Sequence, residues 1–149
     1  MNQKYYNDAI IGNKNIRATF SKKGELLRLY YPSVDFKQFL DFYRVGVKIN
    51  DSGIIYLHDD INNRYNQYYT ENTNILNTEI ENTYFNLQIK QTDFVSIKEN
   101  VLIRKYVLKN NNKLDLNINF LIDSKLLTDE NNMVSGKVVD NGLIQYSCI

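Results

Sequence analysis

Short runs in which apolar and polar residues alternate constrain the fold of this sequence more than any other feature. The clearest run is LDLNINFLI at 114–122, where Leu114, Leu116, Ile118, Phe120 and Ile122 occupy every second position. Alternate side chains of a β-strand point to opposite faces, so this pattern predicts a half-buried strand. No window of a dozen residues shows the period of 3.6 that an amphipathic helix requires. The sequence therefore predicts an all-β protein.

Tight polar turns separate the predicted strands. The segments SKKG at 21–24, NDSG at 50–53 and DNG at 140–142 each lie between two runs of strand character. Gly, Asn, Asp and Ser favour such turns because glycine tolerates positive φ and the short polar side chains bond their own backbone. Each turn predicts an antiparallel hairpin.

A further hairpin is expected from VLIRKYVLK at 101–109, because the polar stretch NNNK separates it from the run at 114–122. We expect Val101, Ile103 and Val107 to be buried against the apolar face of the second strand. Full burial of each such side chain contributes about 1.5–3 kcal/mol.

The chain contains a single proline, Pro32, directly after the strand-like run LLRLYY at 26–31. Proline cannot donate a ladder hydrogen bond, so strand pairing is predicted to end there. The following residues are expected to form a long loop, with at most one helical turn within 35–43, before RVGVKI at 44–49 resumes pairing. Together these elements predict an antiparallel β-sandwich formed by a single domain, residues 1–149.

Composition excludes several classes of function. The net charge is +1, so the chain lacks the field that attracts nucleic acid or anionic lipid. No apolar segment approaches the roughly 18 residues needed to span a bilayer, and the N-terminus lacks the apolar run of a signal peptide. The chain is thus expected to be cytoplasmic, with neither nucleic acid nor membrane as a partner. The single cysteine, Cys148, excludes an internal disulfide.

The residues alone assign no catalytic group, metal or cofactor. His58, Asp59 and Asp60 follow a predicted strand, but one histidine supplies too few ligands for a typical transition-metal site. Glu79 and Glu81 share one face of a strand, where a solvated surface explains them without a catalytic role. No phosphate-binding or dinucleotide-binding motif occurs.

Four segments in order resemble a known family. They are AIIGNKNIRATFSKKGELLRLYYP at 9–32, FYRVGVKINDSG at 42–53, IIYLHDD at 54–60 and TDFVSIKENVLIRKYVLKN at 92–110. Their order and spacing resemble the N-terminal β-domain of bacterial glucoamylase-like enzymes of glycoside hydrolase family 15. Each segment is only a strand and a turn, so the resemblance depends on all four together.

This resemblance implies a large twisted sandwich of the galactose-mutarotase-like supersandwich type, placed ahead of an (α/α)-barrel with two catalytic glutamates. No barrel occurs in these 149 residues, and the family's β-domain is usually longer than this chain. The resemblance thus implies a non-catalytic N-terminal domain of an enzyme that acts on α-glucosidic saccharides. Its implied partner is the barrel, from the same polypeptide or operon. An incomplete sandwich is also expected to expose a strand edge, through which two copies could pair.

Five residues are the candidates for interdomain or carbohydrate contact. Tyr30, Tyr31 and Pro32 match the family's tyrosine-tyrosine-proline corner, whose following loop faces the catalytic domain. The family commonly continues with glycine and asparagine-histidine, whereas this chain reads SVDFKQF, which puts direct sugar contact in doubt. Tyr68 and Tyr69 lie in a polar context where aromatic rings could stack on sugars. Strand ends and ordinary strand propensity explain all of these tyrosines equally well.

Two alternative functions remain open, because sandwiches serve in many roles. One is a free-standing module that binds an oligosaccharide. The other is a structural domain that associates with itself.

Overall fold

The computed structural model describes residues 7–32, 38–126 and 134–147. Twelve strands and no helix occur in these ranges, which confirms the all-β prediction. No helix among the described residues could cross a membrane. Cys148 lies outside the described residues.

One layer of the molecule is a four-stranded antiparallel sheet, here called the four-stranded layer. It consists of β6 (Asn63–Tyr69), β7 (Leu76–Asn82), β8 (Leu87–Val95) and β9 (Leu102–Asn110), in that spatial order. Each strand pairs with its neighbour in sequence, so tight local turns suffice to build the sheet.

The opposite layer begins with β1 (Ala9–Gly12), β2 (Arg17–Phe20) and β3 (Leu26–Tyr30), which form an antiparallel sheet. The predicted turn at 21–24 joins β2 and β3, as expected. Strand β3 ends at Tyr30, two residues before the proline, which confirms that pairing stops at this corner.

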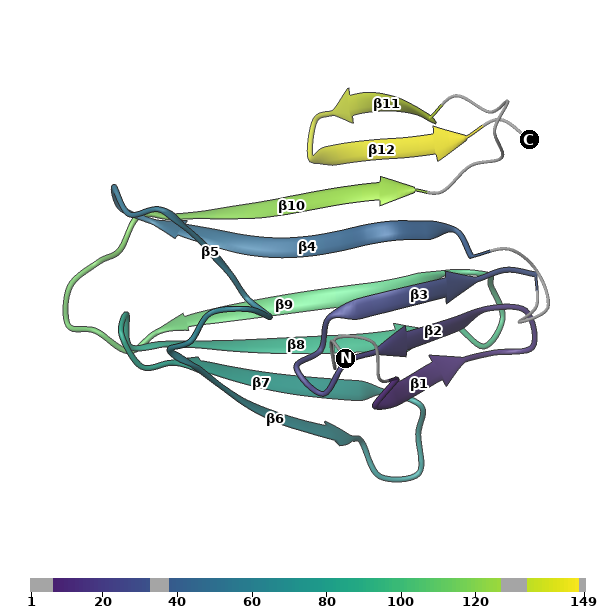
Figure 1. Ribbon diagram of the computed structural model, residues 1–149, viewed down its shortest axis with the longest axis horizontal. Coiled ribbons are helices and arrows are strands. Elements are labelled where there is room, and N and C mark those ends of the chain that lie inside the picture. Colours follow the sequence, from purple (N-terminus) through teal and green to yellow (C-terminus); the bar gives the residue numbers. More distant parts are fainter. Residues whose placement is uncertain (1–6, 33–37, 127–133, 148–149) are drawn as a thin grey trace, which may run out of the picture.

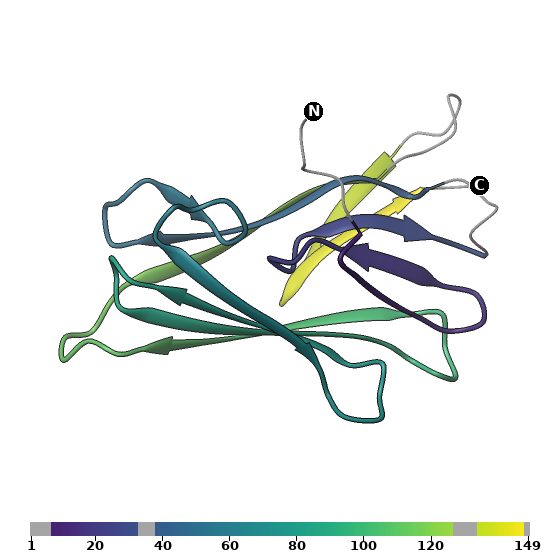
Figure 2. The same cartoon turned by 60° about the horizontal axis from the view of Figure 1, so that its bottom comes forward.

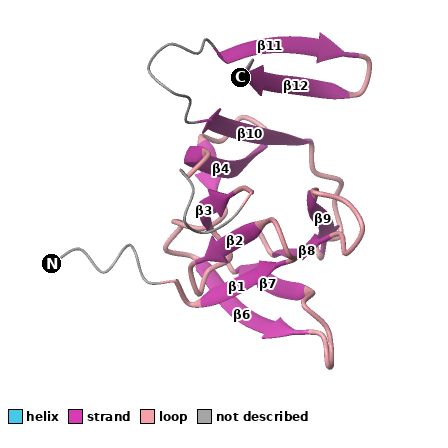
Figure 3. Cartoon of the chain, turned by 90° about the vertical axis from the view of Figure 1, so that its right-hand side faces the viewer, coloured by secondary structure: helices cyan, strands magenta, loops and turns pink. Residues whose placement is uncertain are grey.

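The opposite layer continues with β4 (Leu40–Ile49), which pairs with β5 (Ile54–Tyr56) on one side and β10 (Ile118–Leu126) on the other. A bridge between Tyr30 and Gln38 connects β3 with the start of this sheet. The last hairpin, β11 (Val134–Val139) and β12 (Gly142–Ser147), lies beside β10 in Figures 1 and 3, and among the described residues it pairs only with itself.

The core lies between these two layers (Figure 2). Two clusters of buried side chains fill it, one around β1–β3 and one around β4, β7 and β8. The first comprises Ala9, Ile11, Ile16, Ala18, Phe20, Leu26, Leu40, Leu76 and Val95, and the second Val45, Val47, Ile49, Leu57, Ile80, Leu87 and Ile89. The predicted antiparallel sandwich is therefore confirmed.

The expected hairpin of 101–109 with 114–122 is wrong. Strand β9 pairs with β8, whereas β10 crosses to the other layer and pairs with β4 from Ile118 to Leu126. The two runs are neighbours in sequence, but each finds its hydrogen-bond partner in a different layer. Pairing between strands far apart in sequence cannot be read from local pattern.

The predicted inward face of β9 is wrong as well. Val101, Ile103 and Val107 are exposed, and the side chains that point to the core belong to the other alternation, including Leu102 and Tyr106. Apolar residues occur on both faces of β9, so hydrophobicity alone does not determine which face points to the core.

The loop expected between Pro32 and RVGVKI is shorter than predicted. Strand β4 begins at Leu40, so the residues from there to Tyr43 extend the strand and form no helical turn. Residues 33–37 of this segment lie outside the described residues. Strand pairing resumes early because Gln38 already forms a β-bridge with Tyr30.

Candidate functional site

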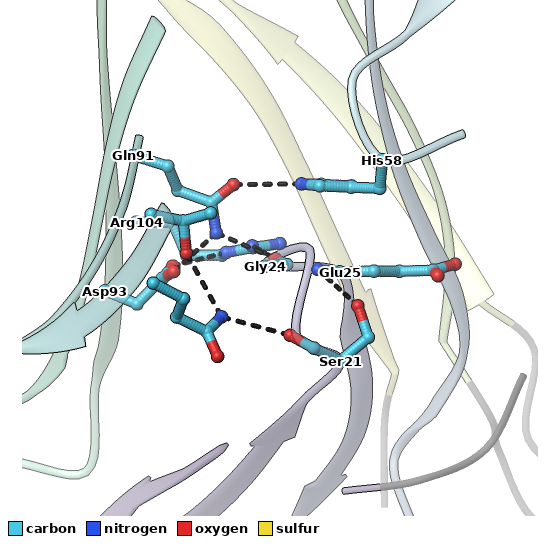
Figure 4. A network of polar contacts seen from close by, with 9 residues as sticks. Ser21, Gly24, Glu25, His58, Gln91, Asp93 and Arg104 are labelled. Carbon is cyan, nitrogen blue, oxygen red and sulfur yellow. Dashed lines mark hydrogen bonds and ion pairs between the residues drawn. The ribbon is translucent and has the colours of Figure 1, made fainter. Parts of the chain in front are cut away.

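A group of polar side chains is buried in the core (Figure 4). On β8 it lies between Ile89 of the second apolar cluster and Val95 of the first. Gln91 and Asp93 continue the inward-facing series of β8, and Arg104 projects inward from the neighbouring strand β9. His58 reaches them from the loop that follows β5. We call these four residues the Arg104 network.

Arg104 is the centre of this network. Its Nε donates to Oδ1 of Asp93 at 2.6 Å, and its Nη2 donates to the carbonyl of Gly24 at 2.9 Å. The guanidinium lies 4.7 Å from the ring centre of Tyr43 and 5.5 Å from that of Phe20. The side chains of Arg104 and Asp93 are 6% and 0% exposed. A charge pair this deep is tolerated only because hydrogen bonds and aromatic faces replace the lost water.

The network also holds the β2–β3 turn against the four-stranded layer. Nε2 of Gln91 donates to the carbonyl of Gly24 at 2.8 Å and to Oδ2 of Asp93 at 2.5 Å. Gly24 has a φ of +84°, and a Cβ at this position would lie 2.8 Å from Oγ1 of Thr78. The turn therefore needs glycine both for its backbone conformation and for its close approach to the sheet.

His58 serves the network as a neutral donor. Its Nε2 lies 2.9 Å from Oε1 of Gln91, which can only accept, so the imidazole donates at this nitrogen. Burial lowers the pKa of His58 to about 4; the charges of Arg104 and Lys23 act in the same direction, against the Gln91 hydrogen bond and the charge of Asp59. The ring thus points into the core, away from any metal-binding role. Among the described residues, no three His, Cys, Asp or Glu side chains gather as metal ligands would.

A groove of about 760 Å³ opens between the layers beside this network. Strands β3, β4, β9 and β10 form its walls, which include Leu29, Tyr31, Tyr43, Leu102 and Arg104. We call it the interlayer groove. Most of its lining is apolar, so it suits an apolar surface or an aromatic or sugar ring better than a charged ligand.

Two buried donors near the interlayer groove have no hydrogen-bond partner, namely Nη1 of Arg104 and the hydroxyl of Tyr106. Burial raises the pKa of Tyr106 and that of Tyr43, so both phenols remain protonated. No acidic residue is among those that line the groove, so it lacks the pair of carboxyl groups that most glycosidases place around the sugar.

The structure places the predicted corner at the mouth of the interlayer groove. Tyr31 is part of its wall, its ring lies 6.5 Å from that of Phe39, and its hydroxyl accepts from Nδ2 of Asn100 at 3.4 Å. Tyr30 is half-buried at the end of β3, and Pro32 is exposed beyond it.

The other predicted tyrosines lie elsewhere, on the edge strand β6 of the four-stranded layer. The hydroxyl of Tyr69 accepts from the backbone N–H of Ile10 and donates to its carbonyl, both at 2.9 Å, so it ties β6 to β1. Tyr68 donates to Oε1 of Glu79 at 2.8 Å on the outer face of the layer. The five predicted residues therefore do not form one site.

Glu79 and Glu81 line a depression of about 500 Å³ on that outer face. Both are exposed, and their cross-strand neighbours are basic: Glu79 pairs with Lys90, and Glu81 pairs with Arg64. A general acid must be shielded from water to hold its proton near neutral pH. This arrangement is a ladder of opposite charges on a solvated sheet face.

Sequence reasoning missed the Arg104 network as a site. One signal was available, because Gln91 and Asp93 stand at the positions that continue the alternation of Leu87 and Ile89. Polar residues at inward positions of a strand require partners, which predicts a buried network. The identity of the partner, Arg104 on the next strand, depends on the register of β8 with β9.

Comparison with known proteins gives one informative relation. No protein-family model and no solved structure matches the chain. A protein of Methanocaldococcus jannaschii named an uncharacterized glycosyl hydrolase is 34% identical over 146 residues. This match includes 97% of the chain but only 22% of the relative's length. Its name specifies neither family 15 nor a substrate, so the match does not support the finer resemblance to bacterial glucoamylase-like enzymes. The chain is thus related to a glycosyl hydrolase much longer than itself.

Proposed function

We propose that this chain is the non-catalytic N-terminal β-domain of a glycoside hydrolase. The observation that carries the proposal is the extent of the match, which takes in nearly the whole chain and 22% of a named glycosyl hydrolase. In this proposal, the catalytic carboxylates belong to polypeptide outside the 149 residues.

The described residues support the proposal that the catalytic carboxylates lie outside this domain. The interlayer groove has no acidic lining, and Glu79 and Glu81 lie on an open sheet face beside basic neighbours. A glycosidase holds its two carboxyl groups about 5–5.5 Å or 6.5–9.5 Å apart around a sugar-sized cleft. The interlayer groove lacks such a pair, and Glu79 and Glu81 are exposed and lie opposite basic residues.

The finer assignment rests on the resemblance to family 15, which adds a glucoamylase-like barrel as partner and α-glucosidic saccharides as substrates. We assign the contact with the barrel to the interlayer groove, since Tyr31 of the matching corner stands in its wall. Tyr69, on the edge strand β6, is not among the residues that line this groove, and its hydroxyl is engaged by Ile10.

The test is to express the complete reading frame that contains residues 1–149 and to assay it on maltose and longer maltooligosaccharides. We expect glucose release, with Glu79→Gln and Glu81→Gln each leaving the rate within about twofold, because neither group touches the substrate. A frame that stops after Ile149, or a protein inactive on every α-glucoside, would contradict the proposal.

A second candidate is oligosaccharide binding in the interlayer groove, which the aromatic rings of Tyr31 and Phe39 at its mouth favour. Sugars commonly stack on such rings while their hydroxyls meet nearby donors. Calorimetric titration of the chain with maltooligosaccharides tests this candidate. It predicts heat that Tyr31→Ala abolishes and Tyr84→Ala, an exposed tyrosine outside the groove, preserves; no heat at millimolar sugar would eliminate it.

A further inference from the structure

The two layers of the sandwich differ in width. The opposite layer runs from β1 through β4 to β10, while the four-stranded layer ends at β9 (Figure 3). The ring of Phe120 on β10 lies 5.2 Å from that of Tyr106 on β9, so the last strands of the two layers meet there. Beyond β9 no described strand faces β10.

The inward face of β10 is consequently left uncovered. Ile118 and Leu126 on this face pack against the core clusters. Phe120 and Ile122 lie between them on the same face of the strand. They are nevertheless 40% and 54% exposed. An inward face that is apolar and open to water marks a contact surface.

Strand β9 offers a free edge at the same place. It pairs with β8 along its whole length, and no described strand pairs with its other side. Such an edge leaves every second N–H and C=O without a ladder partner, which is the surface that an added strand uses. A strand added there would lie beneath β10 and cover Phe120 and Ile122.

We propose that the free edge of β9 accepts an extended segment from the rest of the glycoside hydrolase, which widens the four-stranded layer beneath β10. The segment has apolar residues on its inward face, where they cover Phe120 and Ile122. On its outward face it has acidic residues opposite Lys105 and Lys109, which are exposed on β9. This inference rests on the proposed function. The length of polypeptide in the relative beyond the matched 22% supplies the source of the segment.

A second copy of the chain fits this edge less well. An antiparallel pair of β9 strands centred on Val107 would place Lys105 opposite Lys109, and one centred on Lys105 would place it opposite itself. Like charges directly opposite one another destabilise a sheet, and lysine on an edge is a common barrier to self-association. The same lysines favour an acidic partner strand.

Amide hydrogen exchange in the protein from the complete reading frame tests the proposal. An edge strand protects only alternate amides, whereas a strand paired on both sides protects successive ones. We expect successive protection from Leu102 to Asn110. Protection of alternate amides only would overturn the proposal, even if the protein hydrolyses α-glucosides. Successive protection in an inactive protein would retain this inference and refute the proposed activity.

A substitution at the edge provides the matched comparison. Lys105→Glu reverses one of the charges that face the acidic residues of the added strand, at an exposed position whose partner on β8 is the uncharged Thr92, and Lys14→Glu makes the same change in the exposed β1–β2 turn. We expect Lys105→Glu to speed exchange of the newly protected β9 amides by about tenfold or more, a loss of about 1.4 kcal/mol, while Lys14→Glu leaves them unchanged. Equal effects of both variants would overturn the assigned edge. Successive protection that appears only in a concentration-dependent dimer, seen by light scattering, would show that the occupant is a second copy and overturn the assigned source.

Discussion

At the scale of single residues, four polar side chains decide how the layers are joined. His58, Gln91, Asp93 and Arg104 lie in the core, and each bonds at least one of the others. Their burial makes their protonation and pairing part of the folding free energy. Two predictions follow from the two kinds of ionisable group in this set.

The first concerns His58. Its pKa falls from 6.5 in the unfolded chain to about 4 in the folded protein, so the unfolded chain binds more protons between these values. Stability from this group is therefore complete above about pH 6.5 and is lost as the pH falls toward 4, by at most about 3 kcal/mol. Urea unfolding at several pH values should show a shallower loss for His58→Gln, which does not titrate. If the free energy of unfolding depended on pH in the same way for both proteins, His58 would not be the buried neutral group described here.

The second concerns the Asp93–Arg104 pair. Asp93→Ala leaves a buried guanidinium without its carboxylate, so the free energy of unfolding should fall by about 3–5 kcal/mol. The double variant Asp93→Leu, Arg104→Met removes both charges and should recover at least half of that loss. Urea denaturation measures both. A cost below about 1 kcal/mol for Asp93→Ala would show that the pair is not buried as described.

At the scale of elements, turns and strands were predictable while pairings between strands were not. The turns at 21–24 and 50–53 were correctly identified because glycine and short polar residues determine them locally. The partner of β10 was missed because β4, its neighbour, lies some seventy residues earlier in the chain. The face of β9 was missed because apolar residues occur on both of its faces, and the inward face also carries Arg104, the partner of Asp93.

The β2–β3 turn gives the prediction that belongs to this scale. Gly24→Ala forces an alanine to a φ of +84° and brings its Cβ to 2.8 Å from Oγ1 of Thr78. The strained backbone alone costs about 1–3 kcal/mol, so the thermal midpoint should fall by several degrees. The control is Gly53→Ala in the β4–β5 turn, where a Cβ meets nothing within 4 Å. Equal shifts for the two variants would contradict the role of Gly24 in docking the turn.

At the scale of the whole molecule, the sandwich class follows from the alternation of apolar and polar residues. Strands with one apolar face and one polar face must bury the apolar face. The candidate site was predictable only in part. Tyr31 was found through the resemblance and stands at the interlayer groove, whereas Tyr68 and Tyr69 lie on β6 and are engaged by other groups. Composition could not show which tyrosines lie at the groove, because this depends on the residues that surround each tyrosine in the folded protein.

The account depends on one claim above all, that these 149 residues form a β-domain without hydrolytic groups of its own. Measuring glucose release from maltooligosaccharides by purified residues 1–149 tests it most directly. The account predicts no release above the buffer blank. Release that persists through repurification, and that Glu79→Gln or Glu81→Gln abolishes, would contradict it.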